Sequence, residues 1–237
     1  RIKLFKARQG LNVRKADTLG VKLQGGPSVS LMLDVAKNPH LLFYELELDL
    51  YEFTIIDVVS ANNIKTYVIG FTQNQDIKEP LYQGRIYINA DNYAIIQAQF
   101  NLNLVNKAAA EKLFVRRKPI GVNFVPVSTS YLVNFNERDG IYSLSYARNE
   151  LNFKAIWKRR LFNTRYSITG ELAITDKDSE HVTKFSKSDT FKTTDILAET
   201  AVAFTDDNFW GEYNTIKPEE SIDEAIRKYG KRLKRNK

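Results

Sequence analysis

The stretch "QGRIYINADNYAIIQAQF", residues 83–100, decides the fold class that this chain is expected to adopt. Apolar and polar residues alternate on both sides of Asp91-Asn92, and a period of two is typical of a strand with one face on a core. Asp and Asn favour tight turns. The stretch therefore predicts an antiparallel hairpin. The apolar positions of its two arms include Ile86, Ile88, Ile96 and Phe100.

The same period of two extends over most of the chain after residue 50. "LYEFTIIDVV" (50–59) and "IKTYVIGFT" (64–72) flank Ala61-Asn62-Asn63 and predict a second hairpin, because Asn tolerates positive φ. Residues 141–157 also alternate, with a change of apolar face near Arg148-Asn149 that suggests a β-bulge. Residues 160–176 read as the longest regular strand. Long successive strands of this kind favour one large curved sheet over a sandwich of short strands.

Three segments have the period of a helix. Residues 28–37 form a short amphipathic pattern that ends at Asn38-Pro39, and residues 104–115 are rich in helix-forming alanine. Near the C-terminus, Ser221 and Glu224 have the spacing of a capping box, and an apolar stripe follows them. The sequence therefore predicts an α+β fold: a large, strongly curved antiparallel sheet packed on short helices, with a further helix at the C-terminus.

No internal repeat or low-complexity linker interrupts the chain, so a single domain is expected over residues 1–237. Its predicted parts are an N-terminal strand and turn segment (1–26), the curved sheet with its helices (27–205), and a C-terminal helix with a basic tail (206–237). The first residue is Arg1 and no signal-peptide pattern follows, so we expect the chain to be part of a longer protein.

Composition excludes several chemistries. The 237 residues include no cysteine, which rules out disulfides, thiolate catalysis and Cys-ligated zinc. The net charge of +7 comes from the last eleven residues, which hold seven Lys and Arg and no acid, while the rest of the chain is formally neutral. Because the excess is confined to a terminus, we expect a solvated helix end and no nucleic-acid partner. No apolar run approaches the ~18–20 residues of a membrane helix.

Candidate catalytic residues are few. Neither His40 nor His181 has a metal-ligand spacing, and no GxSxG motif occurs, so we expect no metal, no cofactor and no catalytic histidine. If "ELELDLYE" is extended, Glu45, Glu47 and Asp49 share one face and could bind Ca²⁺, and these three with Glu52 could supply the acid and base of a glycan hydrolase. The simpler interpretation is a solvated strand face with the leucines turned to the core. The carboxylates are Glu45, Glu47, Asp49 and Glu52.

Apolar strand residues suggest a binding surface of another kind. A large sheet has a concave face, and short helices can leave part of it open as a cleft for an apolar ligand. Many of these residues would equally serve as ordinary core. The residues predicted to line such a cleft are Tyr67, Ile69, Phe71, Ile86, Ile88, Ile96 and Phe100.

The C-terminal stretch "DDNFWGEYNTIKPEESIDEAI" (206–226), with "KLQGGP", "YVIGFTQ" and "GRIYINADNYAI", resembles envelope proteins of Bacteroidetes that begin with a carboxypeptidase-regulatory-like β-sandwich. The strand pattern is also similar to that of outer-membrane lipoprotein carriers, whose half-barrel holds acyl chains. The resemblance implies a periplasmic or outer-membrane-associated protein whose partner is a lipid, a lipoprotein or another envelope protein.

The leading hypothesis is therefore a non-catalytic envelope module that binds an apolar or lipid-like ligand, or a protein partner, through its sheet. The alternatives are a glycan-acting hydrolase that uses the clustered carboxylates, and a structural scaffold for an upstream β-sandwich.

Overall fold

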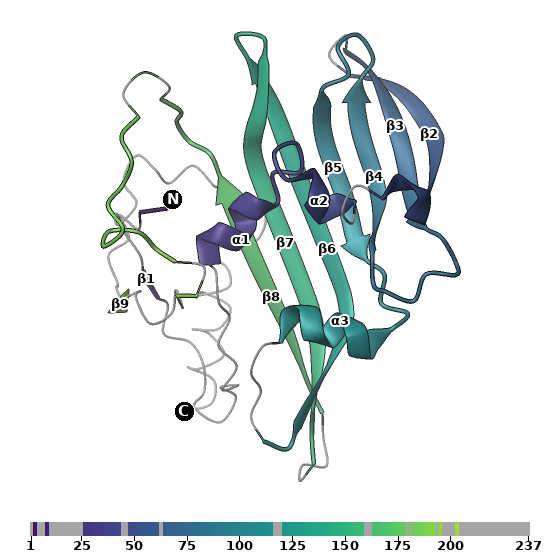
Figure 1. The fold of residues 1–237 in the computed structure, drawn as a ribbon, viewed down its shortest axis with the longest axis vertical. Helices are drawn as coiled ribbons and strands as arrows, with labels where there is room; N and C mark the ends of the chain where they lie inside the picture. Colours follow the sequence, from purple (N-terminus) through teal and green to yellow (C-terminus); the bar gives the residue numbers. More distant parts are fainter. Residues whose placement is uncertain are drawn as a thin grey trace, which may run out of the picture.

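The computed structural model describes most of the chain between residues 26 and 195. The described residues are 2–3, 8–9, 26–43, 47–61, 64–115, 120–158, 163–178, 180, 182–192, 194–195 and 202–203. They form one large sheet with short helices against it (Figure 1). The predicted C-terminal helix and basic tail, and His181, lie outside the described residues.

The large sheet is a seven-stranded antiparallel meander, in which each strand pairs with its neighbours in the chain. Both predicted hairpins are present, which confirms the α+β class and the large antiparallel sheet. Its strands are β2 (Tyr51–Ala61), β3 (Ile64–Gln73), β4 (Tyr82–Asn89), β5 (Ile95–Leu102), β6 (Val122–Arg138), β7 (Ile141–Trp157) and β8 (Thr164–Ala173). Two short strands, β1 (Arg8–Gln9) and β9 (Val202–Ala203), pair in parallel as a separate ladder.

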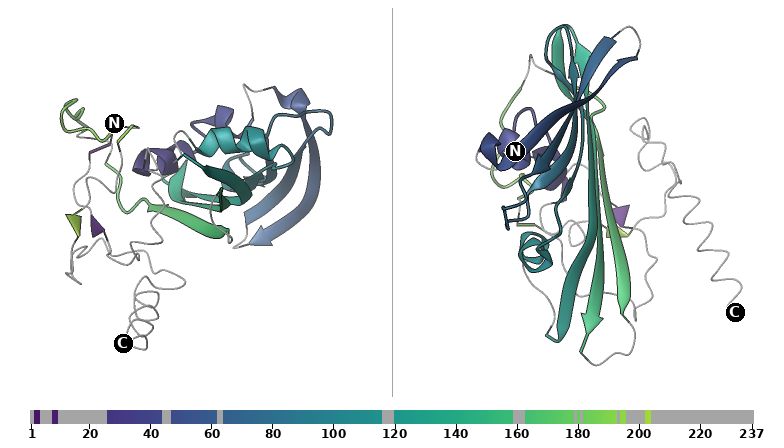
Figure 2. Two further views of the ribbon diagram at one scale, coloured as in Figure 1. Left: turned by 90° about the horizontal axis from the view of Figure 1, so that it is seen from below. Right: turned by 90° about the vertical axis from the view of Figure 1, so that its right-hand side faces the viewer.

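The α-helices that the structure describes lie on the same side of this sheet (Figure 2). They are α1 (Gly26–Met32), α2 (Pro39–Leu42) and α3 (Lys107–Phe114), and a 3-10 turn, η3 (Leu48–Leu50), leads into β2. The predicted helix over 28–37 is wrong at its end, because α1 stops at Met32 and Pro39 begins a second helix. Proline suits a first helical turn, where its missing N–H would have no partner.

The helix predicted over 104–115 is confirmed as α3, with a later start. Asn106 caps it: its side-chain Oδ1 accepts a hydrogen bond from the N–H of Ala109 at 3.1 Å. An N-cap Asn satisfies one of the N–H groups that the first helical turn leaves free. The cap fixes where α3 begins, and α3 then packs against the first half of β6.

Two apolar clusters hold the helices to the sheet. The larger one packs Leu33, Val35 and Leu42, from the α1–α2 segment, against the middle of β3 to β7. The smaller one lies beneath α3, where Val115 contacts Phe124 and its neighbours on β6 to β8. No helix within the described ranges is long and apolar enough to cross a membrane.

The strand lengths differ from those predicted. The longest strands are β6 and β7, at 17 residues each, whereas β8 has 10, so the expectation of one dominant strand over 160–176 is wrong. The predicted bulge near Arg148-Asn149 is also misplaced, because the register shifts at Asn134/Phe135 and leaves Ser145 as the extra residue. A second shift, at Pro126/Ser128, leaves Val127 unpaired. These bulges let two very long strands stay paired while they twist.

Candidate binding surfaces

The register divides the large sheet into two chemically different faces. On the helix side, one row of paired residues is almost wholly apolar: Ile69, Ile86, Ala98, Val133, Ala147 and Leu172. On the opposite side, the adjacent row is polar: Arg85, Gln99, Leu132, Arg148 and Glu171. We call these the helix face and the polar face. Within the described residues, no helix packs against the polar face (Figure 2).

Apart from Ile96, the residues predicted to line an apolar cleft lie on the helix face. The structure divides the predicted residues into two groups by their exposure. Phe71, Ile86 and Phe100 are buried in the larger core cluster, so they are already covered by the chain's own segments. The other members are partly exposed: Tyr67, Ile69, Ile88 and Ile96. Tyr67 pairs with Ile88, and Ile69 pairs with the buried Ile86, so these four residues lie side by side on β3 and β4. Ile96 falls at a register shift between β4 and β5.

Several exposed apolar side chains lie together along β2, at the end of the strand order. Phe53, Ile55 and Val58 face the helix side, because they pair with Phe71, Ile69 and Tyr67 on β3. We call these three residues the edge patch.

The exposed fractions in the edge patch are 43% for Phe53, 65% for Ile55 and 48% for Val58. Phe53 also contacts the ring of Phe43 at 5.6 Å between centroids, which joins the patch to the end of α2. Adjacent exposed apolar side chains mark an interaction site more often than a single exposed residue does.

The cavity beneath α3 is apolar but very small. It has a volume of about 20 Å³, which is close to the space that one water molecule needs. Phe114, Phe124 and Phe153 line it, with Glu111 at its side. An acyl chain does not fit in this volume, so the edge patch is the better candidate for an apolar ligand.

Two tyrosines on the helix face pack against the larger core cluster near the centre of the sheet. Tyr82 and Tyr131 lie edge to face at 5.5 Å between centroids, and Tyr131 stacks on Phe100. Burial raises the pKa of both hydroxyls above the ordinary tyrosine value, and for Tyr131 the neighbouring Tyr82 raises the pKa further. Both rings therefore stay neutral and belong to the packed core.

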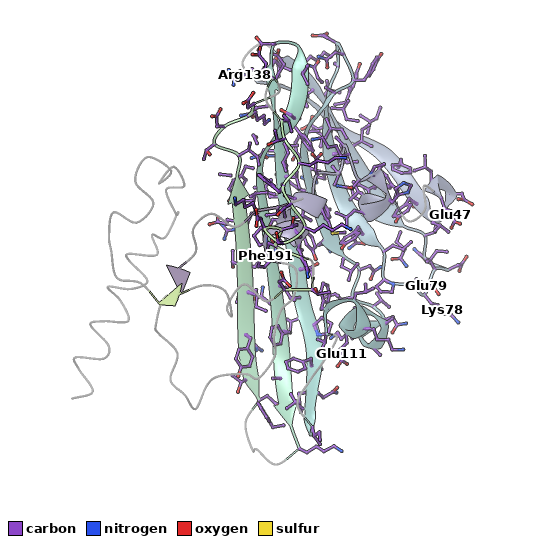
Figure 3. The ribbon with its side chains drawn as sticks, turned by 60° about the vertical axis from the view of Figure 1, so that its left-hand side comes forward. Glu47, Lys78, Glu79, Glu111, Arg138 and Phe191 are labelled. Carbon is purple, nitrogen blue, oxygen red and sulfur yellow. The ribbon has the colours of Figure 1, made fainter. Side chains whose placement is uncertain are left out.

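The carboxylates do not form the predicted row. Leu48–Leu50 is a 3-10 turn and not an extended strand, so Glu47 and Asp49 do not alternate along one face. Both are exposed, as is Glu52 on β2, and Glu45 lies outside the described residues. Glu47 lies at the periphery of the molecule (Figure 3). The extended row assumed for the hydrolase hypothesis is therefore interrupted at Leu48–Leu50.

No metal-binding cluster of His, Asp and Glu occurs among the residues that the structure describes. His40 is exposed in α2.

The polar face contains a hollow that the sequence did not suggest. Strands β5 and β6 pair only from Gln97–Asn134 to Phe100–Tyr131 and then separate. Beyond that point, the N–H of Leu102 donates to Oγ1 of Thr129 at 2.8 Å. The hollow beside this opening has a volume of about 470 Å³, and Arg85, Gln99, Asn101, Ser130 and Leu132 contribute to its lining. Alternation alone identifies which residues share a face, but not where two strands separate.

Comparison of this chain with protein families, with curated proteins and with solved structures finds no match. The function therefore has to be argued from the surfaces described above.

Proposed function

We propose that this chain is a non-catalytic module that binds an apolar or lipid-like ligand through the helix face of its sheet, at the edge patch. The observation that carries the proposal is the exposure of Phe53, Ile55 and Val58 along β2. They lie beside the half-buried Tyr67 and Ile69 of β3. An acyl chain that covered these side chains would remove apolar surface from water, which stabilises the complex by roughly 25 cal/mol per Å² of surface buried.

A cation lies close to this row. Lys65 is on the same side of β3 as Tyr67, and its Nζ lies 5.9 Å from the centre of the Tyr67 ring. A ligand with an acyl chain on the edge patch could place an anionic headgroup near this ammonium group. This arrangement favours an amphiphile with a negative charge over a neutral hydrocarbon.

In this proposal the sheet is the wall of a strongly curved half-barrel, similar to that of the lipoprotein carriers, and the helix face is its concave side. The setting would be the periplasm or the periplasmic side of the outer membrane, as the resemblance to Bacteroidetes envelope proteins implies. The chain's own helices fill the centre of the wall, and the β2–β3 end stays open for the ligand.

The test is titration of the protein with a fluorescent sixteen-carbon fatty acid. The Ile55→Lys variant should weaken binding at least tenfold, because it removes apolar contact and places a charge in the patch. Ile141→Lys is the matched control: Ile141 is also an exposed isoleucine at 69%, but it lies at the start of β7 and outside the patch. Equal binding by both variants and the parent would refute the proposal.

A second candidate function rests on the outer edge of β2. Among the described strands, β2 pairs with β3 alone, so its eleven residues present an edge that a partner strand could extend. Hydrogen exchange of the β2 amides should then slow when a cell-envelope protein extract is added, while the amides of β8 at the other end of the sheet stay unchanged. Unchanged exchange in β2 would count against a protein partner at this edge.

A further inference from the structure

The polar face carries a second site, independent of the edge patch. We propose that the hollow between β5 and β6 binds an acidic polysaccharide, and that Arg85 binds a sugar carboxylate there. The proposal rests on the shape of the hollow, on the free guanidinium of Arg85 and on the ordered amides beside it.

The hollow is large enough for a ligand. Its volume of about 470 Å³ is within the ~300–1,000 Å³ that small-molecule sites commonly have. It forms because β5 and β6 separate after Phe100–Tyr131, while Thr129 satisfies the N–H of Leu102 with its hydroxyl group. The backbone at this opening is therefore stable without a bound ligand, and the space does not require closure of the strands.

Arg85 differs from the other arginine in its row of the polar face. Arg148 lies between two carboxylates, with its guanidinium nitrogens 3.4 Å from Glu171 and 3.9 Å from Glu150. Arg85 is exposed and makes no ion pair or hydrogen bond with any residue in the described part of the chain. A guanidinium group pairs with a carboxylate through two parallel hydrogen bonds, which makes Arg85 the natural anion-binding group of the hollow.

The amides beside Arg85 are held in place by one another. Nε2 of Gln99 donates to Oε1 of Gln97 at 2.9 Å, and Nε2 of Gln97 donates to Oδ1 of Asn134 at 2.8 Å. Each amide group has two N–H donors and an oxygen with two lone pairs, so this chain of bonds leaves further donors and acceptors free. Sugar hydroxyls both donate and accept, and therefore match a surface of ordered amides.

The charges of the polar face favour a glycan over a nucleic acid. Next to the hollow, Glu150 and Glu171 bring negative charge to the same face as Arg148. A phosphate backbone needs several cations along its path, whereas Arg85 is the one cationic side chain among the described residues that line the hollow. A polysaccharide with one carboxylate per sugar needs a single cation in the hollow and polar, uncharged contacts around it. The observed arrangement fits this second ligand.

Isothermal titration of the whole chain with hexagalacturonate tests the proposal, with a neutral maltohexaose and hexaglutamate as comparison ligands. Binding of hexagalacturonate alone is expected. Arg85→Gln should weaken it at least tenfold, and Gln99→Ala should also weaken it. Arg138→Gln is the matched control: this exposed arginine lies at the tip of the β6–β7 hairpin and should leave binding unchanged (Figure 3). Circular dichroism melting should give the same transition for all variants, since these side chains are at the surface.

Other outcomes would overturn the proposal. Absence of hexagalacturonate binding would exclude the site, and equal binding of maltohexaose would show that Arg85 is not the recognition group. Equal binding of hexaglutamate would assign the hollow to acidic peptides. Loss of binding in Arg138→Gln as well as in Arg85→Gln would indicate general charge attraction. The fatty-acid titration is unaffected by any of these results, because the edge patch lies on the other face.

Discussion

Gly84, at the centre of the sheet, allows β4 and β5 to approach closely. A Cβ atom added at this position would lie 2.6 Å from Cα and 2.9 Å from Cβ of Phe100, and closer still to the carbonyl oxygen of Gln99. Non-bonded carbon atoms prefer about 3.5–4.0 Å. Gly84→Ala would thus force the two strands apart by roughly 1 Å at the Gly84–Phe100 pair.

The cost of this change can be estimated. Inserting a methyl group into a packed site costs about 1–3 kcal/mol, and loosening the ladder hydrogen bonds beside it adds about 1 kcal/mol for each bond. The reduced entropy of the unfolded alanine chain offsets about 0.4–1 kcal/mol. We expect Gly84→Ala to lower the free energy of unfolding by about 3 kcal/mol, which is about 1 M in the urea midpoint for a slope near 3 kcal/mol per M.

Urea unfolding followed by circular dichroism is the assay, with Gly170→Ala as the matched control. A Cβ at Gly170 would meet Oδ1 of Asn149 at 2.6 Å, but this is the end of a side chain that can rotate. The same oxygen accepts no hydrogen bond from the described residues, so its displacement breaks none. The control should change stability by less than about 1 kcal/mol. A Gly84→Ala midpoint within error of the parent would refute the reasoning.

Two further predictions concern the sheet interior. Thr129→Val keeps the shape of the side chain but leaves the N–H of Leu102 without its acceptor, so it should lower the free energy of urea unfolding by about 1–3 kcal/mol. The control Thr169→Val, at the exposed polar face, should change this free energy little. Equal effects of the two substitutions would contradict this role of Thr129. Burial raises the pKa of Tyr82, so above pH ~10 the unfolded chain loses a proton that the folded chain keeps, and stability should fall as pH rises. Between pH 8 and pH 10.5 the loss in urea midpoint should be smaller for Tyr82→Phe than for the parent and for the exposed-tyrosine control Tyr93→Phe; identical losses would contradict a raised pKa at Tyr82.

Local sequence chemistry determined the elements of this fold. Alternation of apolar and polar residues predicted the hairpin β4–β5, which turns at Asp91-Asn92, and the hairpin β2–β3. A residue's position in the period of two decides which face of the sheet it shares with its neighbours. Alanine propensity and the Asn106 cap fixed α3. The residues on the helix face were therefore predictable, although three of them proved to be covered core.

Tertiary structure decided the positions of the β-bulges and of the turn before β2, which the alternation pattern did not predict. A bulge shifts the register by one residue wherever long twisted strands must stay paired, so its place at Ser145 depends on β6 as well as on β7. The 3-10 turn at Leu48–Leu50, just before β2, interrupts the predicted carboxylate row.

The candidate sites also depend on the assembled sheet. The hollow at Arg85 lies where β5 and β6 separate, and the edge patch lies on β2, at the end of the strand order among the described strands. The sequence by itself determined the two hairpins, the helix α3 and which strand residues share a face, because these follow from local properties of the backbone. The sites followed from strand order and register, which arise only when distant segments pack together.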